Sequence, residues 1–167
     1  MNYERYIATF FLAGFIITCC HSQTTAYGNV IPPTKVQLKF DSLYPHASNM
    51  AWRLRQKGEN AQVISFDCNC EEGMGHLTIT FDTNGTIMNK NTLISKQDLP
   101  ATIIDYITNN YPNEFEYREV TKITTNSGEL TYRVEMKQTV PDGNATNGWI
   151  YVLKFNGTGG FISQEKR

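Results

Sequence analysis

The residues with the most distinctive chemistry are two cysteines separated by one position, Cys68 and Cys70, which are followed by Met74 and His76. Thiolate, thioether and imidazole groups are the ligands that copper and zinc ions favour. Alternation along an extended strand places both cysteine sulfur atoms on the same face. The spacing therefore permits a metal site, although it matches no recognised zinc-finger or redox motif.

The same strand face also carries Ile64 and Phe66, which favours a structural role for the cysteines as small buried residues. A disulfide is a second alternative in an oxidising compartment, although a bridge between residues two apart on one strand is strained unless a bulge intervenes. We prefer the structural role and expect no cofactor. A periplasmic metal-binding or redox-related site formed by Cys68, Cys70 and His76 is kept as the alternative.

Other patterns of catalytic residues are missing from the sequence. The chain after residue 22 contains only two histidines, His46 and His76, and no Gly-x-Ser-x-Gly motif. The glycine-rich segment 157–160 joins two expected strands, whereas a phosphate-binding loop would lead from a strand into a helix. We therefore predict that the protein is not an enzyme.

Composition and charge exclude two further classes of protein. The 167 residues are 40% hydrophobic, which is enough for a packed core and argues against intrinsic disorder. The 15 basic and 16 acidic residues are spread along the chain and give a net charge of −1. A nucleic-acid-binding protein would show a basic patch, so we expect no nucleic-acid partner.

Residues 1–22 are predicted to be a signal peptide, because the apolar run 7–20 has the length of a signal-peptide core and is short for a membrane span. Cleavage after Ser22 is the preferred interpretation, with a retained anchor helix as an alternative. In a second alternative, Ile17-Thr18-Cys19-Cys20 acts as a lipoprotein box. We expect an exported protein that is periplasmic, outer-membrane-associated or secreted, with a tether over residues 23–32 and membrane contact only through a lipid anchor.

One helical pattern occurs twice in the sequence, at an offset of 67 residues (100 − 33). A proline opens it, apolar residues follow at helical spacing, and Tyr-Pro closes it: Pro33, Val36, Phe40, Tyr44 and Pro45, then Pro100, Ile103, Ile107, Tyr111 and Pro112. Each copy predicts a short amphipathic helix, the second with Asp98 as N-cap. Alternating apolar residues and glycine-containing turns after each copy predict about four antiparallel strands.

The predicted fold is α+β, with two tandem helix-plus-antiparallel-sheet repeats over residues 33–97 and 98–167 that join into one compact domain. Alternation places four large aromatic residues on the same strand faces as Leu54, Val134 and Leu153, and we expect them in the core: Trp52, Tyr132, Trp149 and Tyr151. The opposite sheet face is left open and is the candidate partner-binding face: Arg53, Arg55, Arg118, Arg133, Glu135, Lys137, Ile150, Val152 and Lys154, together with Ser65 and Asp67.

Several short motifs in this order resemble one protein family. They are a helix that ends in Tyr-Pro, the Trp52 strand, the turn Phe81-Asp82-Thr83-Asn84-Gly85 and the helix start Leu99-Pro100-Ala101. From residue 33 to the C-terminus the chain resembles the PepSY-like secreted proteins of Bacteroidetes, which are also called beta-lactamase-inhibitor-like.

The resemblance implies a tandem arrangement similar to beta-lactamase inhibitory protein, with a concave antiparallel sheet, helices behind it and no catalytic residues. We therefore expect an exported, non-enzymatic, inhibitor-like binding module. It would engage an unidentified protein or peptide through the open sheet face.

Overall fold

A computed structural model describes residues 23–26, 30–58, 60–111, 115–138 and 148–167. The expected signal peptide and lipoprotein box lie outside these ranges. The elements in chain order are β1 (Gln23–Ala26), α1 (Thr34–Leu43), β2 (Ser48–Lys57), β3 (Gln62–Glu72), β4 (Gly75–Asp82), β5 (Ile87–Leu93), the 3₁₀ helix η1 (Lys96–Asp98), α2 (Ala101–Asn110), β6 (Phe115–Thr125), β7 (Leu130–Gln138), β8 (Ile150–Asn156) and β9 (Phe161–Lys166). Within the described ranges, no helix is long and apolar enough to cross a membrane.

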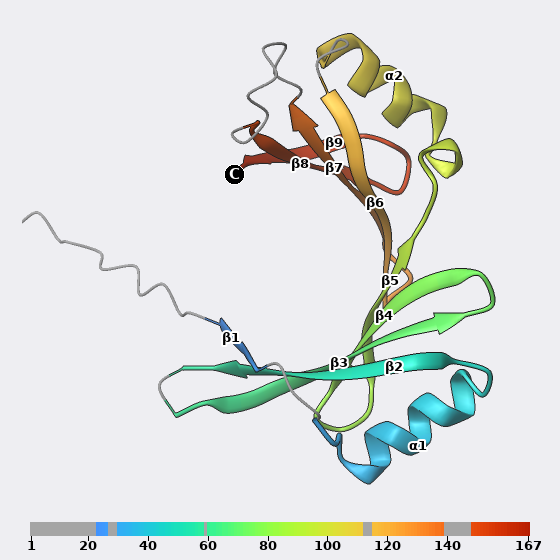
Figure 1. Cartoon of the computed structure of the whole chain (residues 1–167), viewed down its shortest axis with the longest axis vertical. Helices are drawn as coiled ribbons and strands as arrows, with labels where there is room; N and C mark the ends of the chain where they lie inside the picture. The colour runs from blue at the N-terminus through green and yellow to red at the C-terminus, as the bar shows by residue number, and fades with distance from the viewer. Residues whose placement is uncertain (1–22, 27–29, 59, 112–114, 139–147) are drawn as a thin grey trace, which may run out of the picture.

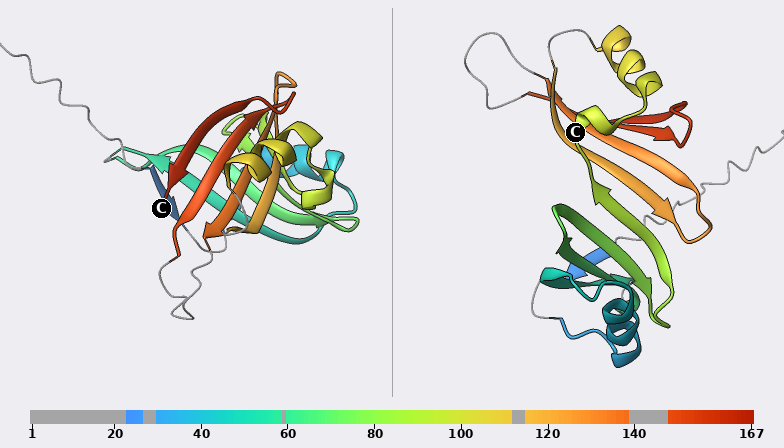
Figure 2. Two further views of the ribbon diagram at one scale, coloured as in Figure 1. Left: turned by 90° about the horizontal axis from the view of Figure 1, so that it is seen from above. Right: turned by 90° about the vertical axis from the view of Figure 1, so that its right-hand side faces the viewer.

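The nine strands of the described ranges each pair with their chain neighbours in one antiparallel sheet, ordered β1 to β9. The sheet curves so that its two ends face each other across a hollow, while α1 and α2 lie on the outer, convex side (Figure 1). Views from above and from the side show a strong twist between the two ends (Figure 2). We call β1–β4 the first arm and β6–β9 the second arm, with β5 between them.

The prediction of two tandem helix-plus-sheet repeats is wrong. β5 and β6 pair through five opposed residue pairs that end at Leu93 opposite Thr121, so one sheet crosses the expected boundary. Two separate sheets would each leave an unpaired edge of N–H and C=O groups at this position. Pairing β5 with β6 removes both edges. The segment 23–32, expected to be a tether, begins with β1, which pairs with β2.

Helix α1 forms where its sequence pattern predicts. Pro33 occupies the N-cap with φ −54°, a value suited to a helix start, and Tyr44 is the C-cap, with its N–H bonded to the Phe40 carbonyl. Val36 and Phe40 are buried against the sheet. Leu43, the last residue of the helix, is 43% exposed.

Helix α2 repeats this construction with one difference at its start. Ile103 and Ile107 are buried, as predicted, but Pro100 is the N-cap in place of Asp98. The Asp98 carboxylate instead accepts a hydrogen bond from the Ser95 N–H at 3.2 Å. This contact completes a capping box on η1, the short helix that leads into α2.

The apolar side chains form two clusters on the convex side of the sheet, one under each helix. The cluster under α1 contains Val36, Phe40, Phe66, Cys68, Cys70, Leu77, Ile79 and Phe81. The cluster under α2 contains Leu99, Ile103, Ile107, Val120, Tyr132, Val134, Met136, Leu153 and Phe155. Because strand residues alternate between faces, burying these side chains turns the intervening polar residues towards the concave side.

Two glycine turns between strands lie against the starts of the helices. Gly85 has φ +86°, and a Cβ placed there would lie 3.2 Å from the Lys35 carbonyl oxygen in α1. Gly159 has φ +89°, and a Cβ there would lie 1.9 Å from Oγ1 of Thr102 in α2. Both turns therefore need glycine for its backbone conformation and for the close approach of a helix.

Candidate functional site on the concave sheet face

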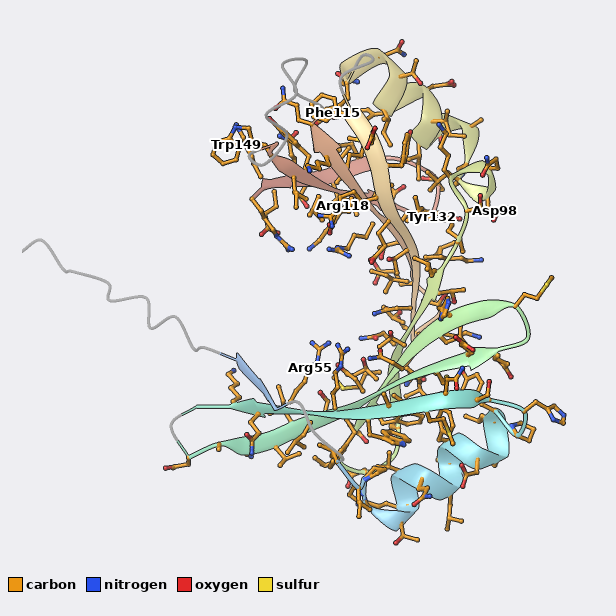
Figure 3. The ribbon with its side chains drawn as sticks, viewed as in Figure 1. Arg55, Asp98, Phe115, Arg118, Tyr132 and Trp149 are labelled. Carbon is orange, nitrogen blue, oxygen red and sulfur yellow. The ribbon has the colours of Figure 1, made fainter. Side chains whose placement is uncertain are left out.

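The strand register places the predicted partner-binding residues on the concave side. Arg53 lies opposite Asp67, and Arg133 lies opposite Lys154. Arg55 and Arg118 come from opposite arms, and both point towards the hollow (Figure 3). The face that the sequence predicts as open is thus the inner surface of the curved sheet. None of the described helices covers it (Figure 1).

On the first arm, Arg55 and Asp67 form an ion pair. Arg55 Nε donates to Asp67 Oδ2 at 2.6 Å. The Asp67 side chain is only 5% exposed, whereas 41% of the Arg55 side chain is exposed. The guanidinium therefore compensates a buried carboxylate while it remains in contact with solvent.

On the second arm, charged side chains of β6 and β7 form a chain of ion pairs. Arg133 Nη1 donates to Glu119 and Arg133 Nη2 donates to Glu135, each at 2.9 Å. Arg118 Nη1 lies 3.4 Å from the second oxygen of Glu135. An irregularity in strand pairing between Tyr117 and Glu119 includes Arg118. The arginines of this arm are therefore held by carboxylates of the same face.

The residues predicted from β8 differ in their accessibility. Lys154 is exposed, and Ile150 is partly exposed beside Lys137, the residue opposite it on β7. Val152 is only 1% exposed. Its neighbours across the strands are Glu135 and Glu165, so Val152 lies between charged side chains and offers little surface to a partner.

An open pocket of about 380 Å³ lies on the concave side where the two arms meet. Its polar lining includes Asn69, Thr78, Asn91, Glu119, Thr121 and Arg133. Asn69, Thr78 and Asn91 lie opposite one another on β3, β4 and β5, and form one row across the sheet. Asp67, Thr80 and Asn89 form the next row. The first row lines the pocket, and the second row lies beside it on the inner surface of the sheet. We call the two rows together the polar floor.

Hydrogen bonds connect part of the polar floor to the arginines. The Asn69 carboxamide makes hydrogen bonds to both Thr78 and Arg53 in the orientation in which its nitrogen donates to Thr78 Oγ1 at 2.7 Å. Its oxygen then accepts from Arg53 Nη2 at 3.1 Å and from Arg53 Nε at 3.2 Å. Asn69 is thus held in position on both sides.

Three other acceptors of the polar floor have no such partners. Within the described part of the chain, the buried atoms Asp67 Oδ1, Asn89 Oδ1 and Asn91 Oδ1 accept no hydrogen bond. Buried polar atoms are almost always bonded in folded proteins, and exceptions call for a physical explanation. Neither asparagine was predicted from the sequence as a site residue. A usable signal was present, because asparagine is depleted in strands and β5 carries it at two positions of the same face.

The cysteine set predicted as the alternative site is not assembled. Cys68 and Cys70 are free thiols buried in the cluster under α1. His76 lies opposite Glu71, with Nδ1 3.5 Å from its carboxylate, and therefore on the concave face. The sheet thus separates the imidazole from the sulfur atoms. No group of three or more His, Cys, Asp or Glu residues within the described ranges could hold a metal ion.

The electrostatics of the thiols also disfavour metal binding and redox chemistry. Burial raises the pKa of the Cys68 thiol strongly above its ordinary value, and Cys70 raises it further. Burial also raises the pKa of Cys70. The thiolate is the form that binds metals and attacks disulfides, so both thiols are held in their inert form. The structural role that we preferred for the two cysteines matches their positions.

Of the four aromatic residues expected in the core, Tyr132 meets the prediction, Trp52 and Tyr151 are partly buried, and Trp149 is exposed. Tyr132 is buried, and Trp52 packs edge-on against Phe40 with ring centroids 5.4 Å apart. Trp149 is 52% exposed, because it precedes β8, and Lys166 Nζ lies 4.0 Å from its ring centroid. The sequence pattern extended the strand one residue too far, so it assigned Trp149 to the core incorrectly.

Neither a protein-family model nor a curated protein matches the sequence. Solved structures do match. A DUF2874 family protein from Bacteroides uniformis has a TM-score of 0.65 at 17% identity, covering 81% of this chain and 90% of that chain. A BLIP-like protein from Bacteroides fragilis has a TM-score of 0.61 at 19% identity, covering 83% of this chain and 89% of that chain. The chain has a BLIP-like fold.

A third match is a Bacteroides eggerthii protein provisionally assigned to the periplasm, with a TM-score of 0.65 at 14% identity, covering 82% of this chain and 90% of that chain. At these identities the likeness concerns the fold alone. It confirms the BLIP-like part of the resemblance found in the sequence, whereas membership of the PepSY-like family stays a prediction. Function is argued below from the site.

Proposed function

We propose that the protein is an exported, non-enzymatic binding module that holds a protein or peptide against the concave face of its sheet. The observation that carries this proposal is the position of both helices on the convex side, which leaves the concave side uncovered by any described helix. That side carries a pocket and charged side chains contributed by both arms. A solvated sheet face needs none of these features.

The geometry suits a macromolecular partner better than a small molecule. The pocket is open and mostly polar at its floor, whereas sites for small molecules are largely apolar and enclosed. Arg55 and Arg118 approach the hollow from opposite arms, so a partner segment between the arms would contact both (Figure 3). Charged groups around such a face favour specificity and fast association.

The exported location of this module is supported by the predicted signal peptide and by the fold shared with the Bacteroides eggerthii protein assigned to the periplasm. The non-enzymatic character is supported by the ion pairs of the face. Its carboxylates are held by arginines on both arms, and no activated nucleophile accompanies them in the described residues. The inhibitor-like role belongs to the same proposal.

The test is site-specific photo-crosslinking in the native host. A photoreactive residue is placed at Lys154, which is exposed on the concave face, or at Lys39, which is exposed on α1. We expect a discrete crosslinked partner from position 154 only. Equal crosslinking from position 39 would place binding elsewhere and refute the proposal.

The crosslinked partner is then purified and its affinity measured by calorimetry with two charge-reversal variants. Lys154→Glu should weaken binding at least tenfold, because it reverses a charge on the proposed interface, while Lys39→Glu should leave the affinity unchanged. Both positions are exposed, so both variants should keep the wild-type melting temperature. Unchanged affinity for Lys154→Glu would remove the concave face as the binding surface.

A further inference from the structure

We infer that a groove on the convex side of the sheet, between the two apolar clusters, binds a phosphate group, either free or as part of a small phosphate ester. The groove has a volume of about 460 Å³ and lies over β5 and β6. It is on the opposite side of the sheet from the concave face. The inference therefore goes beyond the proposed function and does not depend on it.

Two lysines and two threonines of β5 and β6 form the floor of the groove. Lys90 lies opposite Thr124. Thr92 lies opposite Lys122, two residues further along, so all four side chains share one face of the sheet. That face is the convex one, because Lys90 also lies opposite the buried Ile79. The two lysines are diagonal neighbours, and residues in this relation are about 7–8 Å apart. Their flexible four-carbon stems allow both ammonium groups to reach one anion between them.

Neither lysine has a carboxylate partner. Lys90 and Lys122 are half-buried, and neither forms an ion pair within the described residues. No acidic side chain of the described ranges lines the groove. Glu72 lies near one end, where burial and its charge raise the pKa of Tyr44. With Glu72 counted, the local charge is still +1 (2 − 1). An anion between the two ammonium groups would therefore be attracted by both.

The hydrogen-bond donors of the groove suit a phosphate group. The hydroxyls of Thr92 and Thr124 form no hydrogen bond within the described residues, so each can donate to a bound oxygen atom. A phosphate ester carries a charge of about −1.5 to −2 at pH 7 and offers three strong acceptor oxygens. A carboxylate carries a single charge and two oxygens. Two lysines with two hydroxyls therefore match a phosphate dianion better than a carboxylate.

Apolar side chains at both ends leave room for an organic group attached to the phosphate. Ile87 packs against the cluster under α1, and Ile94 packs against the cluster under α2. Lys90 Nζ lies 5.4 Å from the centroid of the Tyr44 ring, which also lines the groove. This cation–π contact holds the ammonium group inside the groove.

The test is a titration of the ¹⁵N-labelled protein at pH 8 and constant ionic strength, followed by the backbone amide signals of Thr92 and Thr124 in NMR spectra. The probes are inorganic phosphate, phenyl phosphate and benzoate, which keeps the ring but carries a carboxylate. We expect saturable shifts with millimolar affinity for both phosphates. Benzoate should not saturate in the same range of concentration.

The two phosphate probes distinguish the sources of the ligand. Binding of phenyl phosphate at least threefold tighter than inorganic phosphate would support an ester whose organic group contacts Ile87, Ile94 or Tyr44. Equal affinities would support the same phosphate site with free phosphate as its ligand.

Variants assign the shifts to the groove. Lys90→Met and Lys122→Met each remove one charge from the groove and should weaken binding of phenyl phosphate at least fivefold. Lys39→Met removes the same charge from an exposed position of α1 and should leave the affinity unchanged. A melting curve for each variant verifies that it is folded, and the comparison of the three probes on the unaltered protein decides the question if a variant is not.

Three results would overturn this inference. They are the absence of saturable shifts with either phosphate, benzoate binding as tight as that of phenyl phosphate, and equal weakening by Lys39→Met and the two groove variants. The last result would show general electrostatic attraction without a site. Crosslinking from position 154 on the concave face reports on the proposed function alone, so the two proposals stand or fall separately.

Discussion

Replacing Gly159 with alanine tests how the glycine turn before β9 holds α2 against the sheet. Gly159 has φ +89°, and an added Cβ would lie 1.9 Å from Thr102 Oγ1 and 2.9 Å from Thr102 Cβ. Rotating the Thr102 side chain relieves the first contact but not the second. The substitution therefore combines backbone strain with a steric clash against the helix.

The two contributions can be separated with a matched position. Gly128 has a similar φ of +82° and has no heavy atom within 4 Å of an added Cβ, so Gly128→Ala introduces strain alone. A left-handed backbone conformation costs a non-glycine residue about 1–2 kcal/mol. Overpacking adds about 1–3 kcal/mol. We expect Gly159→Ala to lower the free energy of unfolding by about 2–5 kcal/mol and the melting temperature by on the order of 10 °C.

The assay is equilibrium unfolding in urea, followed by tryptophan fluorescence, for both single variants and for Gly159→Ala combined with Thr102→Ala. The double variant loses the Oγ1 contact but keeps the Cβ contact, so we expect it to recover part of the difference between the two single variants. The reasoning is refuted if Gly159→Ala costs no more than Gly128→Ala. In that case the helix adapts freely to the turn.

Three further predictions concern other groups. The thiols of Cys68 and Cys70 should resist alkylation at pH 8 in the native state and react fully in urea, as mass spectrometry would show; rapid native labelling would contradict their raised pKa values. The Thr86 N–H and its neighbours in the turn lower the pKa of Asp82 below its ordinary 3.8, so this carboxylate stabilises the fold above that pH and loses its contribution as pH falls through the lowered pKa. Asp82→Asn should therefore reduce the loss of folding stability at acidic pH, and an unchanged loss would assign it to other groups. Arg55→Met should lower the free energy of unfolding by about 1–3 kcal/mol, because it leaves the Asp67 carboxylate uncompensated. In a double-mutant cycle measured by urea unfolding, Asp67→Leu in the same chain should largely cancel this loss, and additive losses would show that the pair is not coupled.

Local signals allowed much of this fold to be predicted from the sequence. Pro33 and Tyr44 bound α1 as expected, because a proline at a helix start and an apolar stripe act within one or two turns of chain. The Asn84-Gly85 turn likewise formed, since its positive φ is set by residue type. The open face was predicted because alternation decides which side chains share a face, once the buried ones are known.

Errors arose where a distant contact decides the outcome. The pairing of β5 with β6 is made by the backbones of two segments about 30 residues apart in sequence, and no side-chain pattern indicates it. The same pairing brings Asn89 and Asn91 to the middle of the concave face. The place of Asn91 in the pocket therefore could not be predicted from the strand that carries it. His76 was grouped with the cysteines because it is close in sequence, although the sheet lies between them.

The sequence by itself determined the two short helices, the glycine turns and the face of each strand that is buried. These properties depend on residue type and on spacing over a few positions. The tertiary structure alone decided that one continuous sheet joins both arms, that its curvature makes the polar side concave, and that three buried acceptors on that side accept no hydrogen bond within the described residues. Each of these features depends on strand pairing between distant parts of the chain. Such pairing is made by backbone hydrogen bonds, which do not depend on the identity of the side chains.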